Sequence, residues 1–327
     1  MKINYFFRNP KVGYSIQRVF QTVNEKISEN TQIEELFLPS PKSNILSILR
    51  NGLYARNHQG KINHITGDAH YLTFFLTSKK TIITVHDIMY YSYLKGLKKK
   101  IWKALYINSL RRAGKVVFIS EFAKQQVLQE LDLPKSKYCV IPNPVSSDFL
   151  KKDKIFNTQK PIILHIGAQS DRKNLGRSIA ALEHISCHLR IIGKMNIEIT
   201  SLLEKHNLEY SNVSNLTNEQ IVKEYENCDI VNFPSLFEGF GMPIIEGQAV
   251  GRAVITSNIS PMKYVAGDAA VLVNPTDIAS IKAGYLKIIN NELFRKEIIQ
   301  KGFENIKQYK VENIAKEYLI LYKEMIK

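Results

Sequence analysis

Short apolar runs alternate with amphipathic stretches along the chain. Residues 80–85 and 229–233 are rich in apolar and β-branched side chains. Such runs are typical of strands in a parallel sheet that helices cover on both faces. Between them, apolar residues recur at spacings of three and four, as from residue 13 to residue 28, which predicts helices. The alternation predicts an α/β protein built on parallel sheets.

The two patterns place the expected elements along the chain. In the first half we expect strands at 1–7, 62–66, 80–85, 116–119 and 138–141, and helices at 13–28, from 45 and from 120. In the second half we expect strands at 161–167, 189–193, 210–214, 229–233, 253–256 and 270–273, helices at 174–187, 198–205 and 218–227, and further helices from 277 to the end.

A proline-rich turn separates the two halves. Pro142, Asn143 and Pro144 are followed by a polar, lysine-rich stretch that ends at Lys160, which is the composition of a linker. A chain of 327 residues has room for two domains of ordinary size. The sequence therefore predicts two α/β domains.

Composition and charge narrow the class of protein. A hydrophobic content of 44% and a charged content of 23% describe a globular chain. The net charge of +15 belongs mainly to residues 1–150, which hold 22 Lys and Arg against 10 Asp and Glu. A field of this sign attracts nucleic acid or an anionic membrane surface. The three cysteines match no zinc spacing and no disulfide framework, and we expect a reducing cytoplasm, no signal peptide and no bilayer-spanning segment.

A strongly basic stretch lies at Lys95–Lys115, with eight Lys and Arg and no acidic residue. At helical spacing Leu97, Ile101 and Leu105 share a face, with Trp102 beside them. A helix of this kind can lie in a membrane interface with its cations on anionic lipid. The alternative is an amphipathic helix packed on the sheet, with a solvated basic face.

The stretch from residue 232 to residue 251 carries the strongest chemical signal. Gly239 and Gly241 let the backbone approach a ligand closely. Pro243 suits the first turn of a helix, where its missing amide hydrogen is not needed. A helix that starts near Met242 directs the positive end of its dipole at whatever lies before it, and this predicts a phosphate site.

This stretch resembles the Glu-x7-Glu segment of the retaining glycosyltransferases of family 4, which have the GT-B fold. The family pattern reads roughly P-S-x-x-E-G-F-G-x-P-x-x-E-A-x-A-x-G. The matching residues are Pro234, Ser235, Glu238, Gly239, Phe240, Gly241, Pro243, Glu246, Ala249 and Gly251. One departure is Gly247, where the family usually has Ala, and we expect it to lower stability slightly without affecting the chemistry.

The resemblance implies a GT-B architecture, in which two Rossmann-like domains face each other across a cleft. It implies an acceptor-side domain at 1–145, a nucleotide-sugar-binding domain at 146–310, and a C-terminal helix at 311–327 that crosses back to the first domain. Matches to the family extend from about residue 84 to residue 277, whereas residues 1–80 match weakly, as expected for an acceptor side.

Two further motifs of the same family lie in the expected order. Arg172 and Lys173 precede a predicted helix and resemble the family's G-x-x-x-x-R-K-N loop, whose basic residues hold the donor's phosphates. Many members have Arg directly after the glycine, where this chain has Ala168. His86 follows a buried strand and resembles the His of the family's V-H-D segment, near the donor sugar. Gly13 matches the family's first glycine-containing loop.

The resemblance implies retaining transfer of a hexose from a nucleotide diphosphate sugar to a sugar or lipid-linked sugar acceptor. Glu246 would accept hydrogen bonds from the ribose, and Glu238 would bind the hexose hydroxyls. The two cations and the helix terminus would neutralise the departing diphosphate. The family's stereochemistry is commonly explained by same-face attack, in which the leaving phosphate takes the acceptor proton and domain closure excludes water.

The expected site residues fall into two sets. The catalytic set is His86, Glu238, Arg172 and Lys173. The donor-binding set is Glu246, Gly239, Phe240, Gly241, Met242 and Gly13. No Asp-x-Asp occurs in the chain, so we expect neither a divalent metal in this role nor a cofactor beyond the donor substrate.

Two rival functions stay open at the level of sequence. A GT-B nucleotide-sugar epimerase would bind the same donor and transfer nothing, although residues 234–251 follow the transferase pattern better. A nucleic-acid-binding protein would suit the basic first half, although no known RNA or DNA module is visible. The resemblance favours bacterial surface polysaccharide or lipopolysaccharide synthesis by a cytoplasmic protein, held peripherally on the inner face of the plasma membrane.

Overall fold

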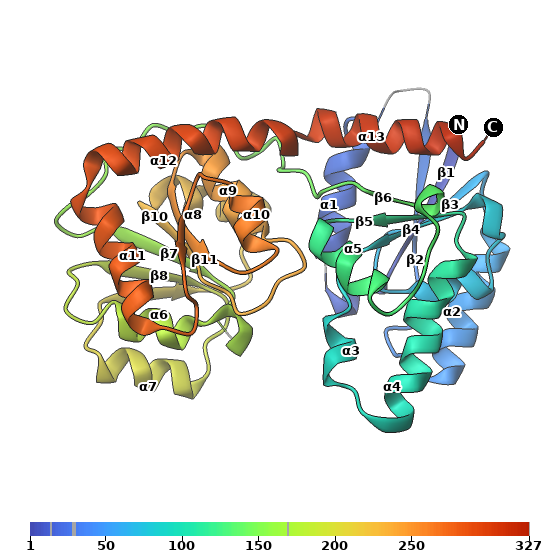
Figure 1. The fold of residues 1–327 in the computed structure, drawn as a ribbon, viewed down its shortest axis with the longest axis horizontal. Helices are drawn as coiled ribbons and strands as arrows, with labels where there is room; N and C mark the ends of the chain where they lie inside the picture. The colour runs from blue at the N-terminus through green and yellow to red at the C-terminus, as the bar shows by residue number, and fades with distance from the viewer. Residues whose placement is uncertain (14, 28–30, 169, 327) are drawn as a thin grey trace. The chain divides into compact units, whose positions relative to one another are not determined.

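The computed structural model describes residues 1–327 except residues 14, 28–30, 169 and 327. The chain divides into two compact units, one made of residues 1–144 with 311–327 and the other of residues 145–310 (Figure 1). The division falls one residue before the domain boundary expected from the sequence. Tyr14 and Ser28, both within the helix expected at 13–28, lie outside the described residues.

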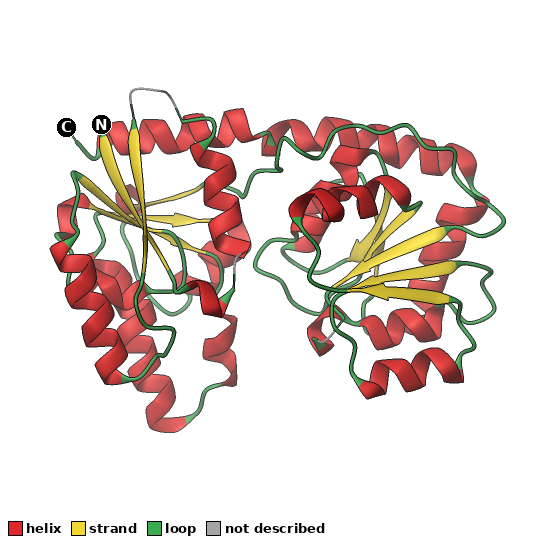
Figure 2. Ribbon diagram, turned by 180° about the vertical axis from the view of Figure 1, so that it is seen from behind, coloured by secondary structure: helices red, strands yellow, loops and turns green. Residues whose placement is uncertain are grey.

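The first unit is built on a six-stranded parallel sheet with the strand order β2-β1-β3-β4-β5-β6. Helices cover both faces of this sheet (Figure 2). Its strands are β1 (Lys2–Phe7), β2 (Gln32–Phe37), β3 (Ile62–Ile65), β4 (Thr81–Val85), β5 (Lys115–Phe118) and β6 (Tyr138–Val140). Its helices are α1 (Ser15–Asn24), α2 (Ile45–Asn57), α3 (Met89–Tyr93), α4 (Gly96–Trp102), α5 (Glu121–Leu128) and α13 (Val311–Glu324).

Alternate residues of β1 build two cores on opposite faces of this sheet. Phe6 packs in a cluster that includes Ala55 of α2. Tyr5 and Phe7 pack on the other face in a cluster that includes α1 and α13. Because successive side chains of a strand point to opposite faces, the apolar run of β1 reflects burial on both sides.

A buried polar network ties α13 to the first sheet. The Tyr322 hydroxyl lies 2.8 Å from the Tyr5 hydroxyl and 2.8 Å from Nδ1 of His64. Nε2 of His64 lies 2.8 Å from the Thr84 hydroxyl, and that hydroxyl is 3.4 Å from the Tyr318 hydroxyl. Burial lowers the pKa of His64 to about 3, so the ring is neutral at physiological pH. Partners on both ring nitrogens fix the register of α13 against β3 and β4.

The second unit holds another six-stranded parallel sheet, with the order β12-β11-β10-β7-β8-β9. Its strands are β7 (Ile162–Ile166), β8 (His188–Ile192), β9 (Tyr210–Val213), β10 (Ile230–Phe233), β11 (Ala253–Ser257) and β12 (Val271–Val273). Its helices are α6 (Leu175–Ala181), α7 (Ile197–Lys205), α8 (Asn218–Asn227), α9 (Met242–Val250), α10 (Met262–Ala266), α11 (Ile278–Asn290) and α12 (Glu292–Asn305). In this order the first strand, β7, pairs with the fourth, β10, which is a topological switch point where ligands bind in open α/β sheets.

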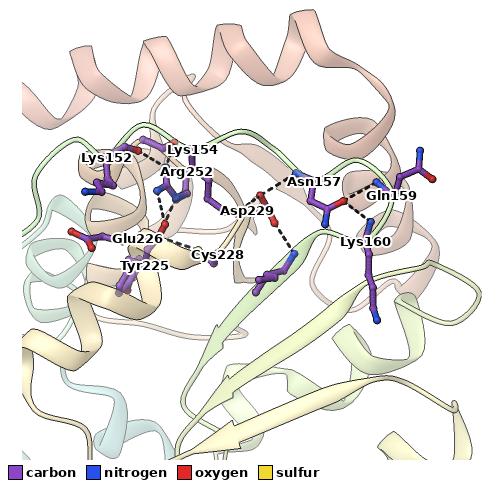
Figure 3. Close-up of polar contacts among 12 residues, drawn as sticks. Lys152, Lys154, Asn157, Gln159, Lys160, Tyr225, Glu226, Cys228, Asp229 and Arg252 are labelled. Carbon is purple, nitrogen blue, oxygen red and sulfur yellow. Dashed lines mark hydrogen bonds and ion pairs between the residues drawn. The ribbon is translucent and has the colours of Figure 1, made fainter.

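The lysine-rich stretch that resembled a free linker is fastened to the second unit (Figure 3). The buried Arg252 guanidinium donates to five carbonyls, including that of Lys152 at 2.9 Å and that of Glu226 at 2.7 Å. The buried Asp229 carboxylate accepts from the Ile162 amide at 2.8 Å and pairs with Lys154 at 3.2 Å. Residues 152–162 therefore belong to the second unit rather than to a flexible connection.

The structure differs from the sequence prediction at several elements. β2 was not predicted, because its sequence QIEELF is polar at three of six positions. α6 ends at Ala181 instead of continuing to residue 187, and residue His184 takes a left-handed conformation with φ 65°. The basic stretch at 95–115 is not one regular helix, since α4 is followed by a π-helical turn at Lys103–Ile107 and a 3₁₀ turn at Asn108–Arg112.

The basic stretch also splits its apolar residues between two environments. Trp102 stacks on Tyr106 with ring centroids 4.8 Å apart, and Leu105 packs on the core of the first unit. Leu97 and Ile101 are 71% and 51% exposed. Of the helices in the described part of the chain, none is both long and apolar enough to cross a bilayer.

Candidate active site

The candidate site lies at the switch point of the second sheet. The loop after β7 contains a 3₁₀ turn at Asp171–Lys173, and the loop after β10 runs from Pro234 to Gly241. Because both strands are parallel neighbours, both loops leave the same edge of the sheet. The two loops are joined through the backbone, since the Leu236 amide donates to the Arg172 carbonyl at 2.7 Å.

Three charged side chains meet between these loops. One Glu238 carboxylate oxygen lies 2.7 Å from Nη1 of Arg172, and the other lies 2.8 Å from Nζ of Lys173. Nη1 of Arg172 also donates to the Phe237 carbonyl at 3.2 Å. The Glu238 and Lys173 side chains are only 11% and 14% exposed. Water screens these ion pairs weakly, so they are stronger than surface pairs.

Lys173 is held from three sides. Its side chain lies over Gly167, where an added Cβ would approach Cγ of the lysine to 3.0 Å. Its Nζ sits over the Phe233 ring, 4.5 Å from the centroid. Burial lowers the pKa of Lys173, whereas the carboxylates of Glu238 and Glu246 act to raise it. The ammonium group is thus fixed in place before any ligand arrives.

The helix that follows the second loop carries the other carboxylate. α9 begins at Met242 with Gly241 as its N-cap, at φ 122°, a conformation that a side chain would strain. Glu246 lies one turn inside α9 and accepts a hydrogen bond from the Tyr225 hydroxyl. The positive end of the α9 dipole and the two cations therefore border the same loop. The Phe240 ring is buried against Tyr309, with centroids 5.6 Å apart, which gives this ring a packing role.

Asn174, which was not among the predicted site residues, positions the two basic residues. Its left-handed backbone, at φ 63°, ends the 3₁₀ turn and begins α6. Its buried amide donates to the carbonyls of Pro234 at 2.9 Å and Pro275 at 2.6 Å. This side chain joins both loops of the site to the loop after β12. The signal was present in the sequence, because Asn is the residue that most often takes a left-handed turn apart from Gly.

A neutral histidine lies under the site. His165, the fourth residue of β7, places Nδ1 2.9 Å from the Asn232 side-chain amide, and Asn232 accepts from the Tyr285 hydroxyl at 2.8 Å. Burial, and then the charge of Lys173, lower the pKa of His165 to about 3. An uncharged ring at this position adds no repulsion to the cations above it.

His86 and Gly13 belong to the first unit, where His86 follows β4 and Gly13 lies in the loop after β1, both at the carboxyl edge of the sheet. Nε2 of His86 lies 2.9 Å from the Thr66 carbonyl, and since a carbonyl only accepts, Nε2 carries the proton. Burial lowers the pKa of His86, so Nδ1 is left as an acceptor in the neutral ring. Gly13 has φ 134°, and a Cβ there would lie 2.9 Å from Nη2 of Arg8. Arg8 pairs with Asp68 at 3.0 Å.

The structure thus brings together the predicted residues of the second unit. Arg172, Lys173 and Glu238 are in direct contact, and Glu246 acts on the charge of Lys173. Tyr225, which holds Glu246, was missed, because it comes from α8 and no local motif marks it. Chemically, two fixed cations and a helix terminus can hold a polyanion, while two carboxylates can accept hydrogen bonds from hydroxyls.

Comparison with known families gives matches over most of the chain. The model of glycosyl transferases group 1 matches residues 146–305. The model of glycosyltransferase family 4 matches residues 21–149. Together they match residues 21–305, which include all of the candidate site residues except Gly13.

Individual relatives and a solved structure agree with the two family matches. The serotype-specific mannosyltransferase WbdA of Escherichia coli is 28% identical over 67% of this chain, although the chain spans only 30% of its length. The O-antigen chain mannosyltransferase B of Escherichia coli is 23% identical over 75% of this chain and 70% of its own. The crystal structure of Anabaena HepE in complex with UDP and glucose superimposes with a TM-score of 0.80 over 99% of this chain and 100% of that one, at 13% identity. The chain therefore has the GT-B fold, as the sequence predicted.

Proposed function

This chain belongs to glycosyltransferase family 4, and we propose that it moves a hexose from a nucleotide diphosphate sugar to a sugar or lipid-linked sugar acceptor with retention of configuration. The observation that carries the proposal is the contact of Arg172, Lys173 and Glu238 beside the amino end of α9, at the switch point of the second sheet. Two cations at a helix terminus suit a diphosphate, and neighbouring carboxylates suit sugar hydroxyls.

The donor lies across this cluster in our proposal. Arg172 and Lys173 hold the diphosphate, and Glu246 accepts hydrogen bonds from the ribose. Glu238 binds hydroxyls of the hexose. The backbone of residues 239–242 approaches the donor, since Gly241 already has the φ that leaves out a side chain. A relative in fold, Anabaena HepE, has been crystallised with UDP and glucose, which supports a donor of this chemical class.

The chemical step follows from charge placement. As the bond from the sugar to the diphosphate breaks, negative charge grows on the departing phosphate. Lys173, fixed by Phe233 and Gly167, stabilises that charge without having to move. The acceptor oxygen then bonds to the anomeric carbon on the face that the phosphate leaves, which gives retention, and the leaving phosphate takes the proton of the acceptor hydroxyl. Because Arg172 and Lys173 supply the positive charge, the step needs no divalent metal. In this proposal Nδ1 of His86, the ring nitrogen that carries no proton, accepts a hydrogen bond from a hydroxyl of the donor sugar.

The acceptor is a glycan of a bacterial surface polysaccharide in this proposal. The support comes from two relatives, a serotype-specific mannosyltransferase and an O-antigen chain mannosyltransferase. Because both relatives are mannosyltransferases, a mannose donor is the first one to test. Since the chain spans only 30% of WbdA, the specificity of that larger protein is not carried over residue by residue.

We further propose that the first unit rests on the inner face of the plasma membrane through α3 and α4. Tyr90, Tyr93, Leu97 and Ile101 are between 51% and 71% exposed, next to lysines that would meet anionic headgroups. A second exposed apolar row lies on α2, at Ile45, Leu46, Leu49 and Leu53. A lipid-linked acceptor would be presented at such a surface.

Membrane contact is tested by flotation with vesicles. We expect wild-type protein to float with phosphatidylglycerol vesicles and not with phosphatidylcholine vesicles. The double change Leu97→Ser with Ile101→Ser reduces flotation several-fold. Leu293→Ser on α12 is the control, because Leu293 lies on the second unit and is 82% exposed, more than either Leu97 or Ile101. Tight, salt-sensitive DNA binding without flotation would contradict the proposal.

The transfer itself is tested with purified protein, a panel of nucleotide sugars and product analysis. Lys173→Ala and Glu246→Ala should each lower transfer by about 100-fold or more, because each removes a group that touches the donor. His86→Ala should lower it as well. Lys282→Ala is the control, since Lys282 donates to the Glu183 carbonyl outside the site. Wild-type rates in all three site variants, or an epimerised donor as the sole product, would refute the assignment.

A further inference from the structure

Glu238 pairs with two cations in the structure, and this pairing excludes the contact with the hexose that the proposed function assigns to it. In the structure both of its carboxylate oxygens are engaged, one with Arg172 at 2.7 Å and the other with Lys173 at 2.8 Å. The proposed function needs the same two cations for the diphosphate and the same carboxylate for the hexose. A carboxylate and a diphosphate are both anions, so they compete for charge-assisted hydrogen bonds from these cations.

We propose that Glu238 is an internal counter-ion that the diphosphate of the donor displaces, and that only the displaced carboxylate orients the hexose. This inference rests on the proposed function and adds a built-in order to it. Diphosphate binding comes first and releases the carboxylate, which then binds hydroxyls of the sugar. The carboxylate thereby keeps the mostly buried ammonium of Lys173 from standing unpaired before a ligand binds.

The surroundings indicate which partner moves. Lys173 is packed against Gly167 and lies over the Phe233 ring, so its ammonium has little freedom. Glu238 instead comes from a loop, directly before Gly239 and three residues before Gly241, whose φ is 122°. A short rotation of the Glu238 side chain therefore moves its carboxylate from the cations to the hexose, while Lys173 stays in place to bind the diphosphate.

Arg172 completes the exchange. Its guanidinium keeps a second bond, to the Phe237 carbonyl at 3.2 Å, when the carboxylate leaves. Its side chain is 35% exposed, more than that of Lys173, so an incoming diphosphate reaches the arginine from solvent. The expected sequence is capture by Arg172, followed by displacement of Glu238 from Lys173.

Removing the charge of Glu238 should therefore have opposite effects on binding and on transfer. Glu238→Gln keeps the shape of the side chain but frees both cations. We expect inorganic pyrophosphate to bind this variant about tenfold more tightly than wild-type protein, because a competing anion is gone. Transfer from the nucleotide sugar falls by about 100-fold, since the hexose loses its carboxylate. Glu238→Ala is the second variant and should show the same opposition.

The measurement is calorimetric titration with inorganic pyrophosphate and with UDP, GDP and ADP at about pH 6. Burial already depresses the pKa of Lys173, and removing the charge of Glu238 lowers that pKa further. A mildly acidic buffer is therefore chosen to keep Lys173 charged in the variants as well as in the wild-type protein. Glu209→Gln is the matched control for net charge. Glu209 pairs with Lys160 and His188 ahead of β9 and is 56% exposed, so pyrophosphate affinity should stay within about twofold.

Each outcome has a clear meaning. Tighter pyrophosphate binding in both folded variants, together with slower transfer, supports displacement. Equal or weaker binding in both variants, with wild-type protein still binding a nucleoside diphosphate and transferring sugar, overturns the inference and leaves the proposed function standing. If neither the wild-type protein nor the variants bind any of the probes, the proposed function and the inference fail together.

Discussion

The amide of Asn174 gives the sharpest test of how the site is held together. It bonds to the carbonyls of Pro234 and Pro275 from a backbone at φ 63°. Asn174→Ala leaves two buried carbonyls without partners, at about 1–2 kcal/mol each, and replaces Asn by a residue that tolerates the left-handed conformation less well, at about 1 kcal/mol. We expect the second unit to lose about 3–5 kcal/mol of unfolding free energy.

Glycine at the same position separates the two contributions. Asn174→Gly loses the same hydrogen bonds but accepts the positive φ, so it should be about 1 kcal/mol more stable than Asn174→Ala. Asn215→Ala is the matched control, because Asn215 is also left-handed, at φ 60°, but exposed. It should lose only about 1 kcal/mol.

Urea unfolding followed by far-UV circular dichroism measures these differences. A loss of about 3–5 kcal/mol lowers the midpoint by about 1–2 M at the urea dependence usual for domains of this size. The single tryptophan, Trp102, lies in the first unit, so its fluorescence follows that unit and shows whether the loss is local. Pyrophosphate binding should weaken in parallel. A midpoint for Asn174→Ala equal to that of Asn215→Ala would refute the role assigned to this amide.

Three further predictions follow from other parts of the structure. Gly247→Ala should destabilise the protein by about 1–3 kcal/mol, because the added Cβ would lie 2.8 Å from Cγ2 of Val231, and thermal unfolding should show most of the loss recovered in the double change with Val231→Ala. The folded pKa of His64, about 3, lies below its unfolded value, so this residue stabilises the fold fully above about pH 6.5 and loses up to about 1.4 kcal/mol per pH unit below it. Urea titrations at about pH 5 and pH 7 should show this slope reduced in His64→Gln, and an unchanged slope would contradict the buried neutral ring. Transfer should keep its rate, to within about twofold, in excess EDTA, whereas its complete loss on chelation would show that a metal takes part.

Gly247 also corrects an expectation from the sequence. Glycine in a helix usually lowers stability relative to alanine, and we expected a small loss from this departure. In the structure, Cγ2 of Val231 and Cγ2 of Val254 would lie 2.8 Å and 3.1 Å from an alanine Cβ at this position. The glycine therefore leaves room for the side chains of the two valines in the sheet, whereas an alanine at this position would strain the packing.

The fold followed from the sequence wherever burial decided the pattern. Thr81–Val85 and Ala253–Ser257 are buried at every position. Strands buried on both faces are largely apolar along their whole length, so a continuous apolar run is enough to predict them. β2 failed this test, because it is an edge strand with only one of its six residues fully buried. Its two glutamates hide the strand from any rule based on apolar runs.

The site was predicted only as far as its motifs are local. Glu238 and Glu246 stand in one contiguous pattern, and Arg172 and Lys173 in another. What the sequence does not contain is the contact between the two patterns. That contact arises because β7 and β10 are neighbours in the sheet, although more than 60 residues separate the two loops. The double pairing of Glu238 is a consequence of topology, and it changed the role that the sequence alone had assigned to this carboxylate.

The most direct test of the central claim is a crystal structure of the protein with a nucleoside diphosphate sugar bound. We expect the diphosphate within hydrogen-bonding distance of Arg172 and Lys173, the ribose on Glu246, and the Glu238 carboxylate turned from the cations to the hexose. A donor bound away from residues 172–173 and 238–246 would contradict the account.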